Sequence, residues 1–282
     1  YKFDVIKKIF YMFIMGKQKY IALIDCDSFF VSCEQKRNPE LKNKAVCVLS
    51  NDEGCVISRS REAKQMGVRM GEPYFMAKKE HPNAVYITAN HEYYGKVSHQ
   101  VMSVLKDFSP YVQIYSVDEA FVDLTGLIKY YNKNYFNLAR FLRQKILDEV
   151  DIPVSIGISS TKTLAKLASD KAKNMPEHVY MIGKRKIHTE LNHTNIVEIW
   201  GIGQRLTVSL KKSGILTAKE LVEKQDEWLD KKIGIHGVEL KHELLGEMTS
   251  QVVNETKQPK SIQNTRAFGV FTSDLNYIKN EL

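Results

Sequence analysis

The sequence is poor in cysteine and contains no long apolar run. Its four cysteines form no C-x-x-C pair and have no histidine at zinc-ligand spacing, which excludes a zinc finger and a disulfide framework and fits a reducing compartment. Residues 9–15 are apolar and follow two lysines, but this run is too short to span a bilayer and no small-residue cleavage site follows it. We therefore expect a cytoplasmic protein without a membrane partner, in which residues 1–18 are a leader or an upstream extension.

Positive charge is concentrated in two segments. The 282 residues carry a formal net charge of +8, with 43% hydrophobic and 26% charged side chains, and this composition suits a globular protein of two or more domains. Residues 54–79 contain six basic and two acidic side chains, and residues 159–186 contain seven and two. A polyphosphate or nucleic-acid partner is the natural inference, with a lysine-rich solvated face as the alternative.

Two adjacent carboxylates, Asp118 and Glu119, lie between two short runs with strand-like alternation, 112–115 and 121–124. The pattern predicts a hairpin with the acidic pair at its tight connection. Like charges side by side repel unless a cation lies between them, and Mg²⁺ prefers carboxylate and phosphate oxygens. An isolated acidic dipeptide is more often a solvated turn, so the prediction of a metal site depends on a second acidic motif.

That second motif consists of Asp25 and Asp27, at the end of the apolar run 20–24. A short continuous apolar run is typical of a buried strand, and a carboxylate at the end of such a strand is held rigidly. Two acidic motifs that converge on a pair of divalent ions would activate an attacking oxygen and stabilise a leaving pyrophosphate. The residues by themselves thus favour phosphoryl or nucleotidyl transfer.

The order of the expected strands and helices suggests a split βαβ, ferredoxin-like sheet. This arrangement places the strand that ends at Asp25 beside the hairpin that carries Asp118. A small basic block at 45–67 interrupts the sheet and resembles an insertion that covers the acidic site from one side. The helix after Thr161 carries lysines, including Lys173, that could hold a triphosphate, with an ordinary amphipathic surface helix as the alternative.

Beyond about residue 185 the pattern becomes entirely helical. Two glycine-containing turns, 200–203 and 234–237, lie between helical segments. Such a turn at the start of a helix frees backbone N–H groups to bind a phosphate oxygen without reading a base, although glycines also cap helices. After residue 258 the composition shifts, and 266–271 is predicted to be the first strand of a further domain.

Five motifs, in matching order and spacing over residues 20 to about 260, resemble the Y-family translesion DNA polymerases, and within them the UmuC-like branch. They are Asp25-Cys26-Asp27-Ser28-Phe29-Phe30, Gly54-Cys55-Val56-Ile57-Ser58-Arg59 with Glu62-Ala63-Lys64, Tyr115-Ser116-Val117-Asp118-Glu119-Ala120-Phe121, Thr161-Lys162-Thr163-Leu164-Ala165-Lys166 and Trp200-Gly201-Ile202-Gly203. The resemblance implies an α+β fold. A ferredoxin-like palm (19–30 and 80–183) with inserted fingers (31–79) would be followed by an all-helical helix-hairpin-helix thumb (184–258) and the start of a truncated little finger (259–282).

The resemblance also implies the site residues. Asp25, Asp118 and Glu119 would be catalytic and would bind two Mg²⁺ ions, with the backbone carbonyl of Cys26 as a further ligand. Phe30 occupies the steric-gate position, where a ring beneath the sugar excludes a 2′-hydroxyl; core packing is its alternative role. The residues expected to bind the nucleotide are Phe29, Phe30, Ser58, Arg61, Lys64 and Lys173, and those expected to bind DNA are Trp200, Gly201, Gly203, Gly234 and Gly237.

Two of these nucleotide contacts depart from the family pattern. Arg61 stands where some relatives have tyrosine, and Lys64 stands where many have arginine, so the details of both contacts differ from the pattern. The implied function is template-directed, error-prone DNA synthesis across damaged bases, in DNA damage tolerance and SOS mutagenesis. The implied partners are primer–template DNA and deoxynucleoside triphosphates, and a sliding clamp and SOS accessory subunits are further candidates.

Two other readings of the sequence stay open. Haloacid-dehalogenase-like phosphatases also begin with an apolar strand that ends in Asp-x-Asp, but that fold requires neither the Asp118-Glu119 hairpin nor the glycine turns. The second alternative is a catalytically impaired DNA-binding polymerase fragment that lacks its little finger. It would retain every motif, and an activity assay distinguishes it from the enzyme.

Overall fold

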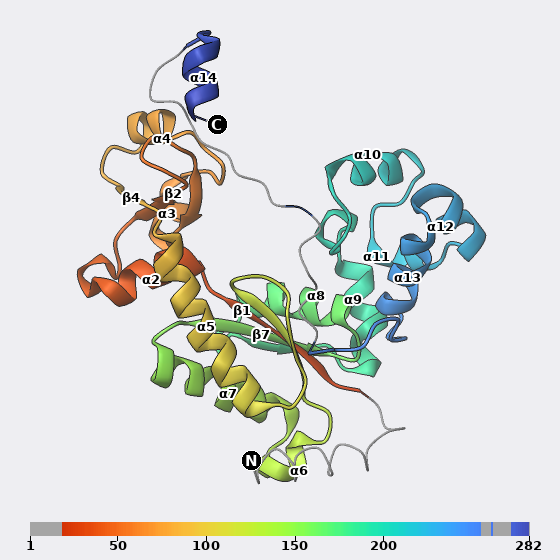
Figure 1. The fold of residues 1–282 in the computed structure, drawn as a ribbon. Coiled ribbons are helices and arrows are strands. Elements are labelled where there is room, and N and C mark those ends of the chain that lie inside the picture. Colours follow the sequence, from red (N-terminus) through yellow and green to blue (C-terminus); the bar gives the residue numbers. More distant parts are fainter. Residues whose placement is uncertain (1–18, 255–260, 262–271, 282) are drawn as a thin grey trace. The chain divides into compact units, whose positions relative to one another are not determined.

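The computed structural model describes residues 19–254, 261 and 272–281. The expected leader at 1–18 and the expected strand at 266–271 lie outside these residues. The chain divides into two compact units, Tyr1–Asn38 with His91–Thr256 as unit 1, and Pro39–Asn90 with Lys257–Leu282 as unit 2. Each unit is described by itself (Figure 1). Within the described part of the chain, no helix combines the length and apolar character needed to cross a membrane.

An antiparallel sheet with one parallel edge forms the centre of unit 1. In the described residues it has five strands in the order β5-β6-β1-β7-β8. Strand β1 is central and antiparallel to both β6 and β7, and β8 is parallel to β7. The bounds are β1 Ile21–Cys26, β5 Val112–Ile114, β6 Glu119–Asp123, β7 Val154–Ser159 and β8 Val179–Met181. Every residue of β1 is buried, as expected for a continuous apolar strand covered on both faces.

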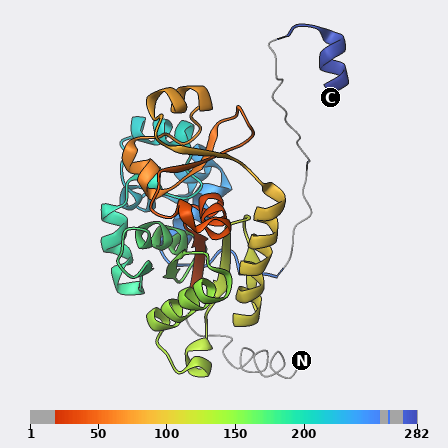
Figure 2. The ribbon, with the colours of Figure 1, turned by 90° about the vertical axis from the view of Figure 1, so that its left-hand side faces the viewer.

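Helices cover the sheet of unit 1. Helices α5 (His91–Phe108) and α7 (Tyr135–Val150) pack against each other, and both views show them side by side (Figures 1 and 2). Helix α8 (Lys162–Ala172) packs against β7 and β1. Shorter helices α2 (Phe29–Arg37) and α6 (Leu127–Tyr131) follow β1 and β6. Apolar residues of α5 recur at helical spacing on one face, and all of these are buried: Tyr94, Val97, Val101, Leu105 and Phe108.

The rest of unit 1 is helical, as predicted from the sequence beyond residue 185. It contains the 3-10 turns η2 (Lys184–Lys186) and η3 (Ile196–Glu198) and the helices α9 Ile187–His193, α10 Gln204–Lys212, α11 Ala218–Val222, α12 Asp226–Ile233 and α13 Ile235–Leu244. One apolar cluster runs from Leu164 and Leu167 of α8 to Leu244 of α13. Because α8 belongs to both the sheet layer and this cluster, it joins the helical part to the sheet.

Unit 2 contains a small sheet of its own, with three strands in the described residues in the order β3-β2-β4. Strand β2 is antiparallel to β3 and parallel to β4. The elements are η1 Pro39–Leu41, β2 Val46–Leu49, β3 Val56–Arg59, α3 Arg61–Met66, α4 Tyr74–Glu80, β4 Val85–Thr88 and α14 Leu275–Glu281. Gly67 caps the C-terminus of helix α3, and its φ of 100° favours glycine.

The bounds expected for the insertion, 31–79, differ from those of unit 2. Helix α2 belongs to unit 1, and strand β4, which falls within the expected palm range 80–183, belongs to the small sheet. The reason is strand pairing: β4 bonds along its whole length with β2, in the register Val46↔Val85 to Leu49↔Thr88. Parallel pairing between distant segments leaves no trace in local periodicity, so the sequence pattern missed it.

Candidate active site

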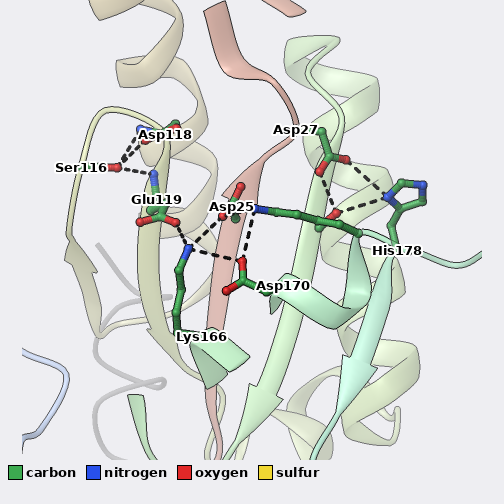
Figure 3. Close-up of polar contacts among 10 residues, drawn as sticks. Asp25, Asp27, Ser116, Asp118, Glu119, Lys166, Asp170 and His178 are labelled. Carbon is green, nitrogen blue, oxygen red and sulfur yellow. Dashed lines mark hydrogen bonds and ion pairs between the residues drawn. The ribbon is translucent and has the colours of Figure 1, made fainter. Parts of the chain in front are cut away.

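Strand pairing brings two of the predicted carboxylates together. Asp25 on β1 is the Cα partner of Glu119 on β6, and directly paired residues project on the same face of a sheet. Asp25 is buried, with 5% of its surface exposed. Figure 3 shows the two carboxylates next to each other. The prediction that the first strand and the acidic hairpin are neighbours is thus confirmed.

Asp118 is held differently. Its backbone carbonyl accepts a hydrogen bond from the N–H of Cys26 at 2.9 Å, which ties the turn to the end of β1. Its carboxylate accepts a hydrogen bond from the hydroxyl of Ser116, and this hydroxyl accepts one from the backbone N–H of Glu119 at 3.0 Å. The side chain of Asp118 therefore lies at the turn beside Ser116 (Figure 3).

Two lysines of one helix bring positive charge to the carboxylates. The ammonium nitrogen (Nζ) of Lys166 lies 3.2 Å from Oδ2 of Asp25 and also binds the carboxylate of Glu119. The Nζ atom of Lys173, the residue that caps the C-terminus of α8, lies 2.8 Å from the same oxygen of Asp25. Asp170 lies within 3.7 Å of Lys166 and 3.4 Å of Lys173. The site consequently contains three carboxylates and two ammonium groups.

Strand alternation explains why Asp25 faces this helix. Ile21 and Leu23 pack in one cluster with Ala165 of α8, and Asp25 is the next residue on that face because alternate strand residues share a face. The close approach of α8 depends on Gly157 of β7. A Cβ atom there would lie 1.9 Å from the backbone nitrogen of Ser169 and 2.3 Å from the carbonyl oxygen of Ala165, so only glycine fits without a shift of the helix.

The ionisation of the two paired carboxylates is unequal. Burial and, after it, the hydrogen bond with Asp25 together raise the pKa of Glu119 to about 7, against the opposing effect of Lys166. For Asp25, burial also favours the neutral form, but the hydrogen bond with Glu119 and the charges of Lys173 and Lys166 lower the pKa below its ordinary value. Asp25 is therefore the stronger acid of the pair.

The donor set fits a hard divalent cation. Asp25 on the central strand β1 and its partner Glu119 on β6 supply carboxylate oxygens, and the ammonium groups of Lys166 and Lys173 lie where positive charge balances these oxygens. In the described part of the chain, no three His, Cys, Asp or Glu side chains converge as a complete metal-binding group, because Asp118 is turned toward Ser116. The structure thus brings together Asp25 and Glu119, and it leaves Asp118 beside them.

A polar cluster fixes the chain just beyond β1. The hydroxyl of Ser155 donates to Oδ1 of Asp27 at 2.7 Å and lies 3.2 Å from Nδ1 of His178. This nitrogen is 3.4 Å from the other oxygen of Asp27 (Figure 3). Asp27 therefore links β1 to β7 and to the start of β8, and its role in the structure is to position the strand end. Nothing in the spacing of Ser155 and His178 indicated this cluster.

Phe30 lies against the aromatic rings of α5. Its ring stacks on Tyr94 at a centroid distance of 4.8 Å and meets the edge of His91 at 5.9 Å. The hydroxyl of Tyr94 donates to the buried carboxylate of Glu34 at 2.7 Å. Phe30 is half-buried, whereas Phe29 is 4% exposed and belongs to the core.

Three of the predicted nucleotide ligands, Ser58, Arg61 and Lys64, belong to unit 2. Ser58 is buried on β3, with 5% of its surface exposed. Arg61 and Lys64 are exposed on α3. Lys173, in unit 1, contacts Asp25 of the paired carboxylates.

The predicted DNA-binding turns precede helices in the helical part of unit 1. Gly201 has a φ of 90°, Gly203 is the N-cap residue of α10, and Gly234 is the N-cap residue of α13 with a φ of 85°. Gly237 lies in the first turn of α13, where a Cβ atom would meet Ile233 at 2.7 Å. Trp200 packs its ring against Tyr115, which follows β5, and Phe121 of β6, at centroid distances of 5.3 and 5.8 Å.

Comparison with known proteins identifies the family of this chain. Residues 24–170 match the model of the impB/mucB/samB family. The chain is 36% identical over 260 residues to protein UmuC of Salmonella typhimurium, covering 90% of this chain and 61% of the relative. It is 37% identical over 229 residues to DNA polymerase IV 1 of Halalkalibacterium halodurans, covering 80% of this chain and 54% of the relative. A solved Y-family DNA polymerase chimera matches with a TM-score of 0.74 and 29% identity, over 84% of this chain and 70% of the other.

The fold and the paired carboxylates thus define a chain of the Y-family polymerase class, with a ferredoxin-like palm, inserted fingers and a helix-hairpin-helix thumb. The chain belongs to the impB/mucB/samB family, and its predicted resemblance to the UmuC-like branch is confirmed. It spans about three fifths of the length of UmuC and just over half that of DNA polymerase IV 1.

Proposed function

We propose that this chain carries the catalytic part of a template-directed DNA polymerase of the error-prone translesion type. The polymerase adds deoxynucleotides to a primer 3′-hydroxyl and acts in DNA damage tolerance and SOS mutagenesis. The observation that supports this most directly is the pairing of Asp25 with Glu119 at the end of a central strand, beside two lysines of α8. A haloacid-dehalogenase-like site would not need the second carboxylate-bearing strand.

Two Mg²⁺ ions would be held by the carboxylates of Asp25, Asp118 and Glu119 and by the backbone carbonyl of Cys26. When bound, such ions lower the pKa of an attacking hydroxyl and neutralise a leaving pyrophosphate. Asp25 contributes a carboxylate that is already ionised and fixed by burial. Glu119 would supply a second pair of carboxylate oxygens, and Asp118, whose carboxylate accepts a hydrogen bond from Ser116, would supply a third.

The assignment as a polymerase also implies which residues bind the nucleotide and the DNA. Lys173 would bind the triphosphate together with Ser58, Arg61 and Lys64 of the fingers, and Phe30 would lie beneath the sugar with Phe29 behind it in the core. Primer–template DNA would contact the thumb through backbone N–H groups at the turns of Gly201, Gly203, Gly234 and Gly237, with Trp200 holding the first turn to the palm. A sliding clamp and SOS accessory subunits are proposed partners of the whole protein.

Primer extension with Mg²⁺ and deoxynucleoside triphosphates at low salt tests the proposal. Low salt is chosen because phosphate contacts weaken steeply as salt concentration rises. We expect extension of a templated primer by the wild type and no extension by Asp118→Ala/Glu119→Ala. Asp148→Ala/Glu149→Ala is a matched control, because it removes an adjacent acidic pair from the exposed end of α7 and should extend like the wild type.

DNA binding, measured by fluorescence anisotropy, separates the two ways in which extension can fail. Absence of extension by the wild type with DNA binding intact would refute the catalytic proposal for this chain and identify a catalytically impaired DNA-binding fragment. Equal extension by the wild type and Asp118→Ala/Glu119→Ala would refute the assigned site.

A further inference from the structure

Asp25 has more positively charged partners than the proposed reaction explains. Both Lys166 and Lys173 place their ammonium groups on its Oδ2 atom, at 3.2 and 2.8 Å. Lys173 comes seven residues after Lys166 and caps α8 with helical backbone angles, so two helical turns place the two lysines on the same face. Triphosphate binding gives Lys173 a partner in the nucleotide complex, but it does not account for the contact of Lys173 with Asp25.

The two lysines are held unequally. Lys166 is 18% exposed along its side chain and joins Asp25 to Glu119, so it links two paired strands. Lys173 is 39% exposed, follows the last residue of α8, and has Asp170 as its second partner at 3.4 Å. If Lys173 left Asp25, Lys166 would still neutralise that carboxylate. Loss of Lys166 would instead leave both carboxylates of the pair without their shared cation.

We propose that Lys173 is a placeholder cation, which occupies Asp25 in the metal-free protein and leaves it when a divalent cation binds, whereas Lys166 stays and keeps Asp25 and Glu119 together. The inference rests on the proposed function, because it uses the cation site assigned there. It follows that a polyphosphate that draws Lys173 away strengthens binding of a cation at Asp25, and that the cation in turn strengthens binding of the polyphosphate. Linkage requires this coupling to be reciprocal.

Binding of Mn²⁺ alone, without DNA or nucleotide, measures the competition directly. Mn²⁺ binding is measured by isothermal titration calorimetry or by the loss of the electron paramagnetic resonance signal of free Mn²⁺. Lys173→Met should bind Mn²⁺ about fivefold more tightly than the wild type, the upper end for a partly exposed ion pair. Lys171→Met is the matched control, because it removes the same charge from the same helix while its ammonium group contacts Glu190 and not Asp25. It should bind Mn²⁺ within about twofold of the wild type, as expected for a screened charge.

Thermal unfolding in a chelator tests the role of Lys166. Lys166→Met should lower the melting temperature of the metal-free protein clearly more than Lys173→Met does, since it removes the cation that the two carboxylates share. Added Mn²⁺ should restore much of that loss. A merely structural lysine would lower the melting temperature without this rescue.

The outcomes separate this inference from the proposed function. Equal Mn²⁺ affinities for the wild type, Lys173→Met and Lys171→Met overturn the placeholder role of Lys173. If Asp25→Asn abolishes Mn²⁺ binding in that case, the proposed cation site stands without a placeholder lysine. Binding by Lys173→Met but not by the wild type supports the placeholder role. Absence of Mn²⁺ binding by every form overturns both the inference and the cation site.

Discussion

Replacing Gly157 by alanine places a methyl group in space that the backbone of α8 already occupies. The new Cβ atom would lie 1.9 Å from the nitrogen of Ser169, 2.3 Å from the carbonyl oxygen of Ala165 and 2.5 Å from the carbonyl carbon of Ala168. All three neighbours are backbone atoms of one helix, so no side-chain rotation relieves the contact. Helix α8 must move away from β7, or β7 must bend.

The structure sets the size of the effect. Overpacking in a core costs about 1–3 kcal/mol, and three backbone contacts this short place Gly157→Ala near the upper end, about 3 kcal/mol. For a chain of this size each kcal/mol shifts the melting temperature by about 2–4 °C, so we expect a loss of about 6–12 °C. Activity should fall further, because α8 carries the lysines at Asp25 and a displacement of about 1 Å in an active site can cost about 100-fold.

Gly95→Ala is the matched control for this change. Gly95 is exposed within α5, and a Cβ atom there has no neighbour within 4 Å. Alanine is favoured over glycine in a helix by about 0.8–1.0 kcal/mol, so the same substitution should stabilise the protein at this position. Both variants are compared by thermal and urea unfolding and by primer extension well below their melting temperatures. A melting temperature for Gly157→Ala equal to that of the wild type would refute the close packing of α8 on β7.

Two further predictions concern buried carboxylates outside the acidic site. Tyr94→Phe removes the hydrogen bond to buried Glu34 and should lower the free energy of urea unfolding by about 1–3 kcal/mol; an unchanged value would contradict the importance of that bond. Burial opposes ionisation of Glu190, but hydrogen bonds from Lys171 and Tyr180 lower its pKa below the ordinary 4.5. Because the folded-state pKa is lowered, ionised Glu190 stabilises the protein above pH 4.5, and this stabilisation is lost as the pH falls. The melting temperature of Glu190→Gln should therefore fall less than that of the wild type between pH 7 and pH 3.5.

Local periodicity was sufficient to predict the elements that carry the site. The run before Asp25 is a strand with every residue buried, and the stripe that begins at Tyr94 faces the core of unit 1. Both patterns are properties of consecutive residues, so they can be read without knowledge of the fold. The pairing of β4 with β2 was missed because it depends on contacts between segments about forty residues apart.

Side-chain partners were harder to predict than strands. The spacing of Lys166 and Lys173 shows that they share a helix face, but their contact with Asp25 depends on the absence of a side chain at Gly157. That requirement cannot be seen in the sequence, where Gly157 is one small residue in an alternating strand. A close approach of two backbones is specified by tertiary packing, and glycine only permits it.

The adjacent carboxylates of the hairpin show why sequence adjacency does not imply a shared site. Successive residues of a strand project to opposite faces, so Asp118 and Glu119 would not both face α8 if the strand began one residue earlier. Strand β6 begins at Glu119, which gives Glu119 the face of Asp25 and leaves Asp118 in the turn. There the backbone of Asp118 bonds to Cys26 and its side chain bonds to Ser116. Asp118 can therefore rotate toward the pair without breaking strand pairing, as the proposed metal site requires of it.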